Sequence, residues 1–143
     1  MGQIRQIPIR EFMTTNVTSL HITETLSDAY EKMNNHHIRH LPVIDDRKKV
    51  VGIFTSLDLN RAHSPRQTEE GWWYYDKDGL SRLTVRHFMT KEPVTLTPDN
   101  TLKEAAEIMA LEKFGCIPII DAKSELAGII TYIDVLKHVA TLF

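Results

Sequence analysis

The chain has 143 residues, of which 42% are apolar and 25% charged, and its 17 Lys and Arg residues nearly balance its 19 Asp and Glu residues. A formal charge of −2 gives no positive field for a nucleic-acid backbone, so the composition argues against DNA or RNA as a partner. The single cysteine excludes an intramolecular disulfide, and no segment resembles a signal peptide or a membrane span. These features predict a cytoplasmic protein without a membrane partner.

The predicted elements follow the same order twice. Each half is expected to hold a short strand, an amphipathic helix with a Thr N-cap, two apolar strands and a second helix. In the first half these elements are expected near Val17, from 26, at 40–44, at 50–55 and from 56. In the second half they are expected near Val94, from 102, at 116–120, at 126–131 and at 132–143.

This duplication is visible in the residues themselves. When the chain is aligned with itself so that REFMT at 10–14 lies over RHFMT at 86–90, 17 of the 52 pairs from residue 10 to residue 61 are identical. Repeats of this kind indicate a duplicated supersecondary unit. The sequence predicts repeat 1 at 4–61, a connector at 62–80 and repeat 2 at 81–143. Because a repeat of about 50 residues is too short to bury a good core alone, each repeat is expected to depend on the other.

Three motifs recur in both repeats: an F-M-T opening, an h-P-h-h-D strand (h is apolar) and a G-h-h-T-x-x-D element at 52–58 and 128–134. This combination resembles a tandem pair of CBS domains, the arrangement called a Bateman module. The resemblance implies an α+β fold of two β-α-β-β-α half-domains, related by pseudo-twofold symmetry with their sheets packed face to face. It also implies a homodimer, and clefts between the repeats that bind AMP, ADP or ATP, with S-adenosylmethionine and NADH as further candidates.

The T-x-x-D elements supply the first candidate ligand-binding residues. A carboxylate such as Asp58 or Asp134 can accept hydrogen bonds from both hydroxyls of a ribose, and a hydroxyl such as Thr55 or Thr131 can donate to a phosphate oxygen. The same four residues also have the spacing of a capping box at the start of a helix, and the two roles are compatible.

The two repeats differ in the residues that lead into the h-P-h-h-D strand. Repeat 1 places Arg39 and His40 there, where the family often puts basic residues on ligand phosphates, whereas repeat 2 has Gly115 and Cys116. We therefore expect phosphate binding in repeat 1. In repeat 2 Lys113 is the available substitute, and the ligand is expected to be less charged or absent.

Other reactive residues have simpler interpretations. His36, His37 and His40 lack the convergent ligands of a zinc site, so no metal is expected; if the histidines face a phosphate, affinity should weaken as the pH rises above about 6.5. Cys116 is interpreted as a buried core residue rather than a redox switch. The repeated methionines, Met13, Met33, Met89 and Met109, are interpreted as core residues.

The connector, AHSPRQTEEGWWYYDKDGL, gathers four aromatic residues at 72–75 in a segment without predicted secondary structure. Three interpretations are open: a hydrophobic plug on its own domain, a contact with a second copy or a partner, and base stacking on a bound ligand.

Together these features predict a non-catalytic regulatory module for allosteric regulation or energy sensing. It needs no cofactor and passes the state of an adenine nucleotide to a separate effector protein or a further domain. No catalytic triad, Walker loop or paired-carboxylate site is recognised, so an enzyme is not expected. The alternative is a structural dimerisation or scaffold module that binds no ligand.

Overall fold

The computed structural model describes residues 6–143, which divide into two compact units. Among the described residues, the first-repeat unit contains 18–47 and 51–92, and the second-repeat unit contains 6–17, 48–50 and 93–143. Residues 4 and 5 of the expected first repeat lie outside the described residues. The architecture is mixed α+β, as predicted from the sequence.

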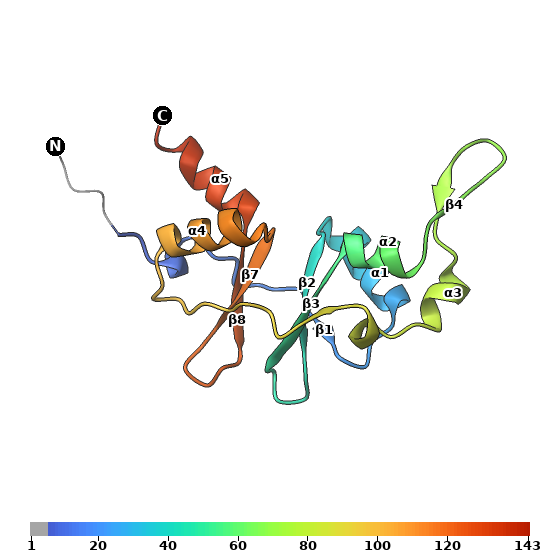
Figure 1. Cartoon of the computed structure of the whole chain (residues 1–143), viewed down its shortest axis with the longest axis horizontal. Helices are drawn as coiled ribbons and strands as arrows, with labels where there is room; N and C mark the ends of the chain where they lie inside the picture. The colour runs from blue at the N-terminus through green and yellow to red at the C-terminus, as the bar shows by residue number, and fades with distance from the viewer. Residues whose placement is uncertain (1–5) are drawn as a thin grey trace. The chain divides into compact units, whose positions relative to one another are not determined.

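The first-repeat unit is built on a four-stranded sheet. Apart from those of the connector, its elements are β1 (Leu20–His21), α1 (Leu26–His36), β2 (His40–Ile44), β3 (Val50–Thr55), α2 (Ser56–Ala62), a 3-10 turn (Val85–His87) and β6 (Thr90–Lys91). The strand order is β1-β2-β3-β6, with β1 parallel to β2 and β6 antiparallel to β3. α1 packs against both α2 and β2 (Figure 1). β1 begins later than the expected position at Val17, because the fully buried Leu20 is the residue that pairs with β2 and enters the core.

The second-repeat unit repeats this topology with fewer regular strand residues. Its elements are a 3-10 turn (Ile9–Glu11), α4 (Leu102–Glu112), β7 (Cys116–Ile120), β8 (Leu126–Thr131) and α5 (Tyr132–Ala140). β7 and β8 form an antiparallel pair. The position of β1 is taken by a single parallel bridge from Leu96 to Ile119, and that of β6 by a bridge from Thr14 to Ile129. In the repeat alignment, the bridge from Leu96 to Ile119 corresponds to the β1–β2 pair Leu20–Val43. The bridge from Thr14 to Ile129 corresponds to the β6–β3 pair Thr90–Ile53.

The F-M-T openings are exchanged between the repeats. The opening of repeat 1 adds Thr14 to β8 of repeat 2, and the opening of repeat 2 adds Thr90 to β3 of repeat 1. The residues just before each opening are also buried in the other repeat: Ile9 belongs to the hydrophobic cluster of the second-repeat unit, and Val85 to that of the first. The expected dependence of each repeat on the other therefore takes the form of an exchanged segment.

This exchange explains the glycine of the G-h-h-T-x-x-D element. A Cβ atom on Gly52 would lie 2.4 Å from the Met89 Sδ atom and 2.9 Å from the Thr90 carbonyl oxygen. A Cβ atom on Gly128 would lie 2.9 Å from the Thr14 carbonyl oxygen. The F-M-T opening of one repeat thus crosses the glycine of the other at a distance that no side chain permits.

Each unit has its own hydrophobic cluster. Met33 and Met109 are buried in the two clusters, and the methionines of the openings pack against them, which confirms their interpretation as core residues. Cys116 is also buried, and burial raises the pKa of its thiol to about 12. A thiol in this environment stays protonated at neutral pH, as the core interpretation requires.

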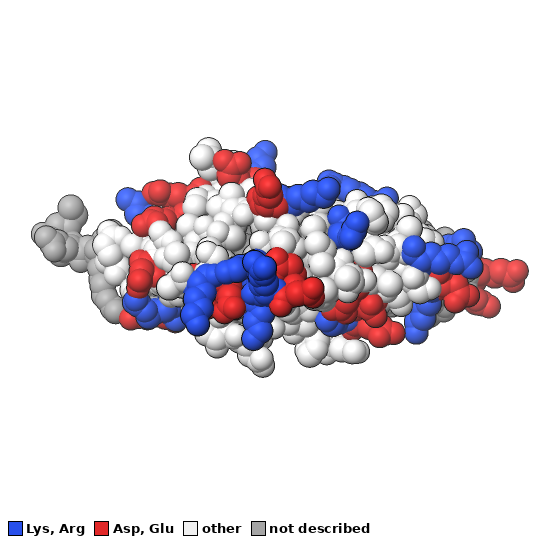
Figure 2. Space-filling model, turned by 90° about the horizontal axis from the view of Figure 1, so that it is seen from below, with Lys and Arg blue, Asp and Glu red and all other residues white. Residues whose placement is uncertain are grey.

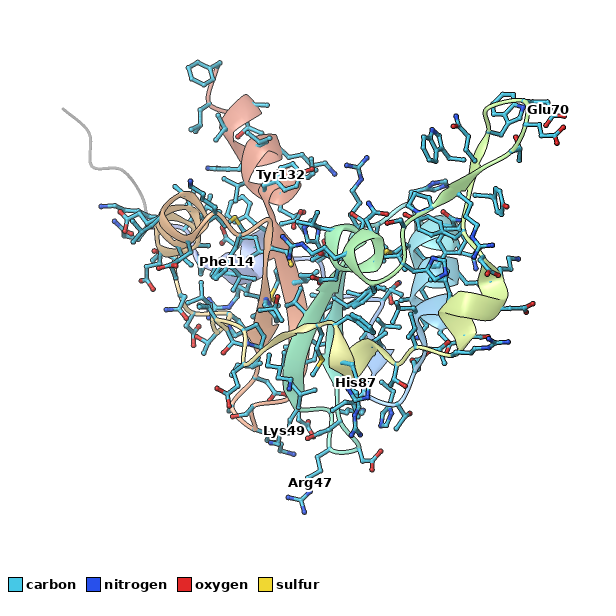
Figure 3. All side chains as sticks on the ribbon, turned by 45° about the vertical axis from the view of Figure 1, so that its right-hand side comes forward. Arg47, Lys49, Glu70, His87, Phe114 and Tyr132 are labelled. Carbon is cyan, nitrogen blue, oxygen red and sulfur yellow. The ribbon has the colours of Figure 1, made fainter. Side chains whose placement is uncertain are left out.

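The connector is more ordered than the sequence predicts. It forms a short antiparallel hairpin of β4 (Arg66–Gln67) and β5 (Trp73–Tyr74), followed by the helical turn α3 (Lys77–Ser81). The hairpin extends away from α2 in Figure 1, and Glu70 marks its tip in Figure 3. Trp72 and Trp73 are 74% and 67% exposed, so a plug formed by these side chains on their own domain is wrong.

Charge is distributed without a dominant sign. On the face shown in Figure 2, acidic and basic side chains are interspersed, in keeping with the net charge of −2. Among residues 6–143, no helix combines the length and the apolar character that a membrane span requires.

Candidate functional site

Both T-x-x-D elements form complete capping boxes. In repeat 1 the Thr55 backbone N–H donates to the Asp58 Oδ2 atom at 2.9 Å, and the Asp58 backbone N–H donates to the Thr55 Oγ1 atom at 3.3 Å. In repeat 2 the corresponding bonds between Thr131 and Asp134 are 2.9 and 3.4 Å. The motif therefore caps a helix in both repeats, at the start of α2 and of α5.

The capping bonds occupy one oxygen of each carboxylate. In repeat 1 the Thr55 hydroxyl donates to the same Oδ2 atom, at 3.1 Å, as the Thr55 backbone does. A carboxylate has two oxygens with several acceptor positions, so capping through Oδ2 is compatible with a second role for Oδ1. Asp58 is only 7% exposed, so a ligand can reach only a small part of this carboxylate.

The backbone brings the basic residues of repeat 1 to the T-x-x-D element. The Ser56 N–H, at the first residue of α2, donates to the Arg39 carbonyl oxygen at 3.0 Å. Repeat 2 preserves this bond between Tyr132 and Gly115 at 3.1 Å, but Gly115 has no side chain to offer. The predicted asymmetry between the repeats therefore lies in the side chains on an equivalent backbone.

His40 begins β2 and is half-buried. Burial and, to a smaller degree, the neighbouring Arg39 guanidinium lower the pKa of His40. The Arg39 side chain itself is exposed. Lys113, the suggested substitute in repeat 2, is the exposed left-handed C-cap of α4 with φ of 60°, so it matches His37 of repeat 1, which caps α1 with φ of 53°. Lys113 thus lies at the end of the helix, before Gly115, the position equivalent to Arg39.

A pocket of about 350 Å³ lies beside Arg39 in the first-repeat unit. Its lining comes from α1, the segment before β2, the start of α2 and the connector: Tyr30, Met33, Asn34, His37, Ile38, Arg39, Ser56, Leu59 and Tyr75. Of the residues expected from the sequence to bind a ligand, Arg39 lines this pocket, whereas His40, Thr55 and Asp58 are not among its lining residues.

The aromatic part of this pocket is not predicted from the sequence. The Tyr30 and Tyr75 rings pack with their centroids 4.9 Å apart, and the Tyr75 hydroxyl donates to the Asn60 Oδ1 atom. Burial and, secondarily, Tyr30 raise the pKa of Tyr75, so its hydroxyl remains a donor at neutral pH. The helical spacing assigned Tyr30 to a core face, and nothing in the sequence singled out Tyr75 from the three exposed aromatic residues before it.

Within residues 6–143, no group of three His, Cys, Asp or Glu side chains is close enough to hold a metal ion.

Comparison with known proteins identifies the family. The CBS domain model matches residues 9–64 and 85–141. The chain belongs to the CBS domain family. A CBS domain-containing protein of Dictyostelium discoideum is 30% identical over 135 residues, which cover 92% of this chain and 90% of that protein. In contrast, an inosine-5'-monophosphate dehydrogenase of Korarchaeum cryptofilum, 33% identical over 124 residues, matches 87% of this chain and only 22% of its own length.

Two solved structures show the same fold as this CBS pair. The CBS domain pair of protein MJ0100, in complex with 5'-methylthioadenosine and S-adenosyl-L-methionine, has a TM-score of 0.80 at 21% identity, covering 97% of this chain and 100% of that one. CBSX2 in complex with AMP has a TM-score of 0.77 at 25% identity, covering 95% of this chain and 98% of that one. The recognition of two CBS repeats from the sequence is thereby confirmed.

Proposed function

We propose that this CBS pair is a non-catalytic regulatory module that binds an adenine nucleotide and passes its state to an effector protein. The observation that carries the proposal is the meeting of Arg39 with the T-x-x-D element in repeat 1, through the bond between Ser56 and Arg39. The similarity to CBSX2 in complex with AMP supports the choice of ligand.

The ribose and the phosphate of the nucleotide each have candidate partners in repeat 1. The Oδ1 atom of Asp58 accepts from the ribose hydroxyls, while Oδ2 keeps the helix capped. The Arg39 guanidinium serves the phosphate, with His40 contributing when it is protonated. The Thr55 hydroxyl donates to a phosphate oxygen only when it releases its own bond to the Asp58 Oδ2 atom, and the Thr55 backbone N–H then keeps that oxygen bound. AMP, ADP and ATP are the leading ligands, with S-adenosylmethionine and NADH as further candidates.

Repeat 2 is proposed as the weaker site. Thr131 and Asp134 keep the same capping geometry as in repeat 1, but Gly115 stands where repeat 1 has Arg39. Lys113 is the substitute cation, displaced to the end of α4. The ligand of this repeat is therefore proposed to carry less negative charge.

Regulation requires that the ligand favour one arrangement of the protein over another. A ligand shifts a two-state population from 1:99 to 99:1 when it binds the favoured state about 5.5 kcal/mol more tightly. Charge-assisted hydrogen bonds contribute about 1.5–3 kcal/mol each, so a ribose contact and a phosphate contact formed only in one state approach this value.

We propose a homodimer as the functional assembly, with α5 in the contact. Four of its residues, Tyr132, Ile133, Leu136 and Val139, are large, apolar and between 39% and 56% exposed. Exposed apolar surface of this kind marks interaction sites. Light scattering should give a dimer for the wild type and a smaller mass for Leu136→Glu, with Lys137→Glu as the matched control on the same helix.

Calorimetric titration with AMP, ADP, ATP, S-adenosylmethionine and NADH tests the ligand. The proposal expects a nucleotide to bind, and Arg39→Gln to weaken binding of the nucleotide while leaving binding of adenosine unchanged. Arg86→Gln, an exposed arginine of the same unit, is the control. If no compound in the series binds, the alternative of a scaffold module without a ligand is favoured.

A further inference from the structure

The pocket beside Arg39 has a composition that suits a particular class of ligand. One part of its wall is aromatic and aliphatic, with Tyr30, Tyr75 and Leu59, and the other part is polar, with Arg39 and Asn34. None of its nine lining residues is acidic. Ligand pockets in proteins are mostly apolar with a few placed polar groups and have volumes of about 300–1,000 Å³, so 350 Å³ suits a small molecule.

We propose that this pocket is a binding site for a small planar aromatic anion, closed on one side by Tyr75 of the connector. The ring of the ligand packs against the Tyr30 and Tyr75 rings, which already contact each other at 4.9 Å, and its anionic group meets the Arg39 guanidinium. This pocket does not include Asp58, the proposed ribose-binding residue. Of the side chains proposed to bind the nucleotide, the pocket shares only Arg39.

Three residues of the pocket have no comparable counterpart in the second repeat. In the repeat alignment, Tyr30, Asn34 and Arg39 correspond to Ala106, Ala110 and Gly115. These small residues supply neither an aromatic wall nor a cation. The remaining aromatic residue, Tyr75, comes from the connector, which follows repeat 1 and packs within the first-repeat unit. The duplication therefore does not explain Tyr30, Arg39 and Tyr75, although other lining residues have counterparts in repeat 2, such as Met109 for Met33 and Lys113 for His37.

The connector also links the pocket to an exposed surface. Tyr75 directly follows β5, which carries Trp73 and Tyr74, and its hydroxyl is held by Asn60 of α2. The chain has two tryptophans, Trp72 and Trp73, and both lie close to Tyr75 in the sequence. A ligand that packs on the Tyr75 ring therefore changes the surroundings of the hairpin, and tryptophan emission reports its binding.

Two probes test whether the ligand of this pocket is a purine phosphate or an aromatic carboxylate. AMP is a purine phosphate, and 4-hydroxyphenylacetate is an aromatic carboxylate without a ribose. Each is titrated by calorimetry, with tryptophan emission excited at a wavelength that the probe does not absorb. Binding of at least one probe, with a change in emission that saturates together with the heat, is expected. Absence of binding by both probes overturns the site.

Two matched pairs of variants locate the binding. Tyr75→Leu is expected to weaken binding at least tenfold, whereas Tyr74→Leu, a neighbour outside the lining, leaves it unchanged. If Tyr75→Leu unfolds, Asn34→Phe fills the pocket from the exposed surface of α1, and Asn35→Phe is its control. Equal affinities within the pair that folds overturn the proposal.

The outcome for this site is distinguishable from that of the proposed nucleotide function. If Asp58→Asn abolishes AMP binding while Tyr75→Leu and Asn34→Phe weaken the binding of neither probe, the nucleotide function stands and the aromatic pocket is refuted. If 4-hydroxyphenylacetate binds with the expected loss in Tyr75→Leu while no adenine nucleotide binds, the pocket stands and the nucleotide function is refuted.

Discussion

Replacement of the motif glycines by alanine tests the exchange of the F-M-T openings. A Cβ atom at Gly52 or Gly128 meets a backbone carbonyl oxygen of the exchanged segment at 2.9 Å, well inside ordinary van der Waals contact, which begins at 3.4 Å. Backbone cannot swing away as a side chain can, so the opening must shift. Overpacking of this kind costs about 1–3 kcal/mol, and the lower entropy of the unfolded alanine chain offsets about 0.4–1 kcal/mol of it.

The net destabilisation is therefore roughly 0.5–2 kcal/mol for Gly52→Ala and for Gly128→Ala. An unfolding entropy of about 2.1 cal/mol/K per residue gives about 0.3 kcal/mol/K for this chain, so the Tm should fall by about 2–7 °C. Thermal unfolding followed by circular dichroism or calorimetry measures this shift.

Gly79→Ala is the matched control. Its added Cβ atom lies 2.5 Å from the His63 Nε2 atom, at the end of a side chain that can rotate away, and the residue lies in the helical turn α3. Alanine is favoured over glycine in a helix by about 1 kcal/mol, so the Tm should be unchanged or higher. If Gly52→Ala and Gly128→Ala behave like Gly79→Ala, the close crossing of the openings is refuted.

Three further predictions concern single residues. Folding lowers the pKa of His40 from 6.5, so the unfolded chain binds the proton more tightly than the folded chain, and the free energy of unfolding falls as the pH drops below 6.5. In urea unfolding, this free energy should fall more steeply between about pH 7 and pH 5 for the wild type than for His40→Gln. Equal slopes would contradict the lowered pKa of His40. Thr131→Ala removes the side chain of a capping box at the start of α5 and should cost about 0.5–2 kcal/mol in urea unfolding. This cost should exceed that of Thr141→Ala at the exposed C-cap of the same helix, where the hydroxyl donates to the His138 carbonyl oxygen at 2.6 Å, and equal values would argue against the N-cap. Cys116, with a thiol pKa of about 12, should react with a thiol reagent at about pH 8 only when the protein is unfolded, and rapid labelling of the native protein would refute its burial.

The repeat pattern made most of the fold predictable. The Thr N-caps and the apolar strands are predictable because each depends on residues close together in the sequence. The constant offset between the repeats shows that the same elements occur twice. The exchange of openings could not be predicted, because it pairs Thr14 with Ile129 and Thr90 with Ile53, and the same F-M-T motif would fit the sheet of either repeat. The close approach of Thr90 to Gly52 identifies the partner of each opening, and this approach is visible only in the folded structure.

The candidate site was predictable to a similar depth. The T-x-x-D spacing indicated both the capping box and the ligand role, and the capping box is present at Thr55 and Asp58. The aromatic pocket escaped prediction because Tyr30 has the spacing of a core residue and its partner Tyr75 is far away in the sequence. That contact depends on the path of the connector, and the absence of periodicity in that segment left its path open.

The most direct test of the proposed nucleotide binding is calorimetric titration of the chain with AMP, for the wild type and for Arg39→Gln. Loss of a hydrogen bond to a charged group costs about 1.5–3 kcal/mol, which corresponds to an increase in Kd of about tenfold to 150-fold. We expect saturable binding of AMP to the wild type, a loss of affinity of this size in Arg39→Gln and no loss in Arg86→Gln. An equal affinity for AMP in all three proteins, or no binding to the wild type, would contradict this expectation.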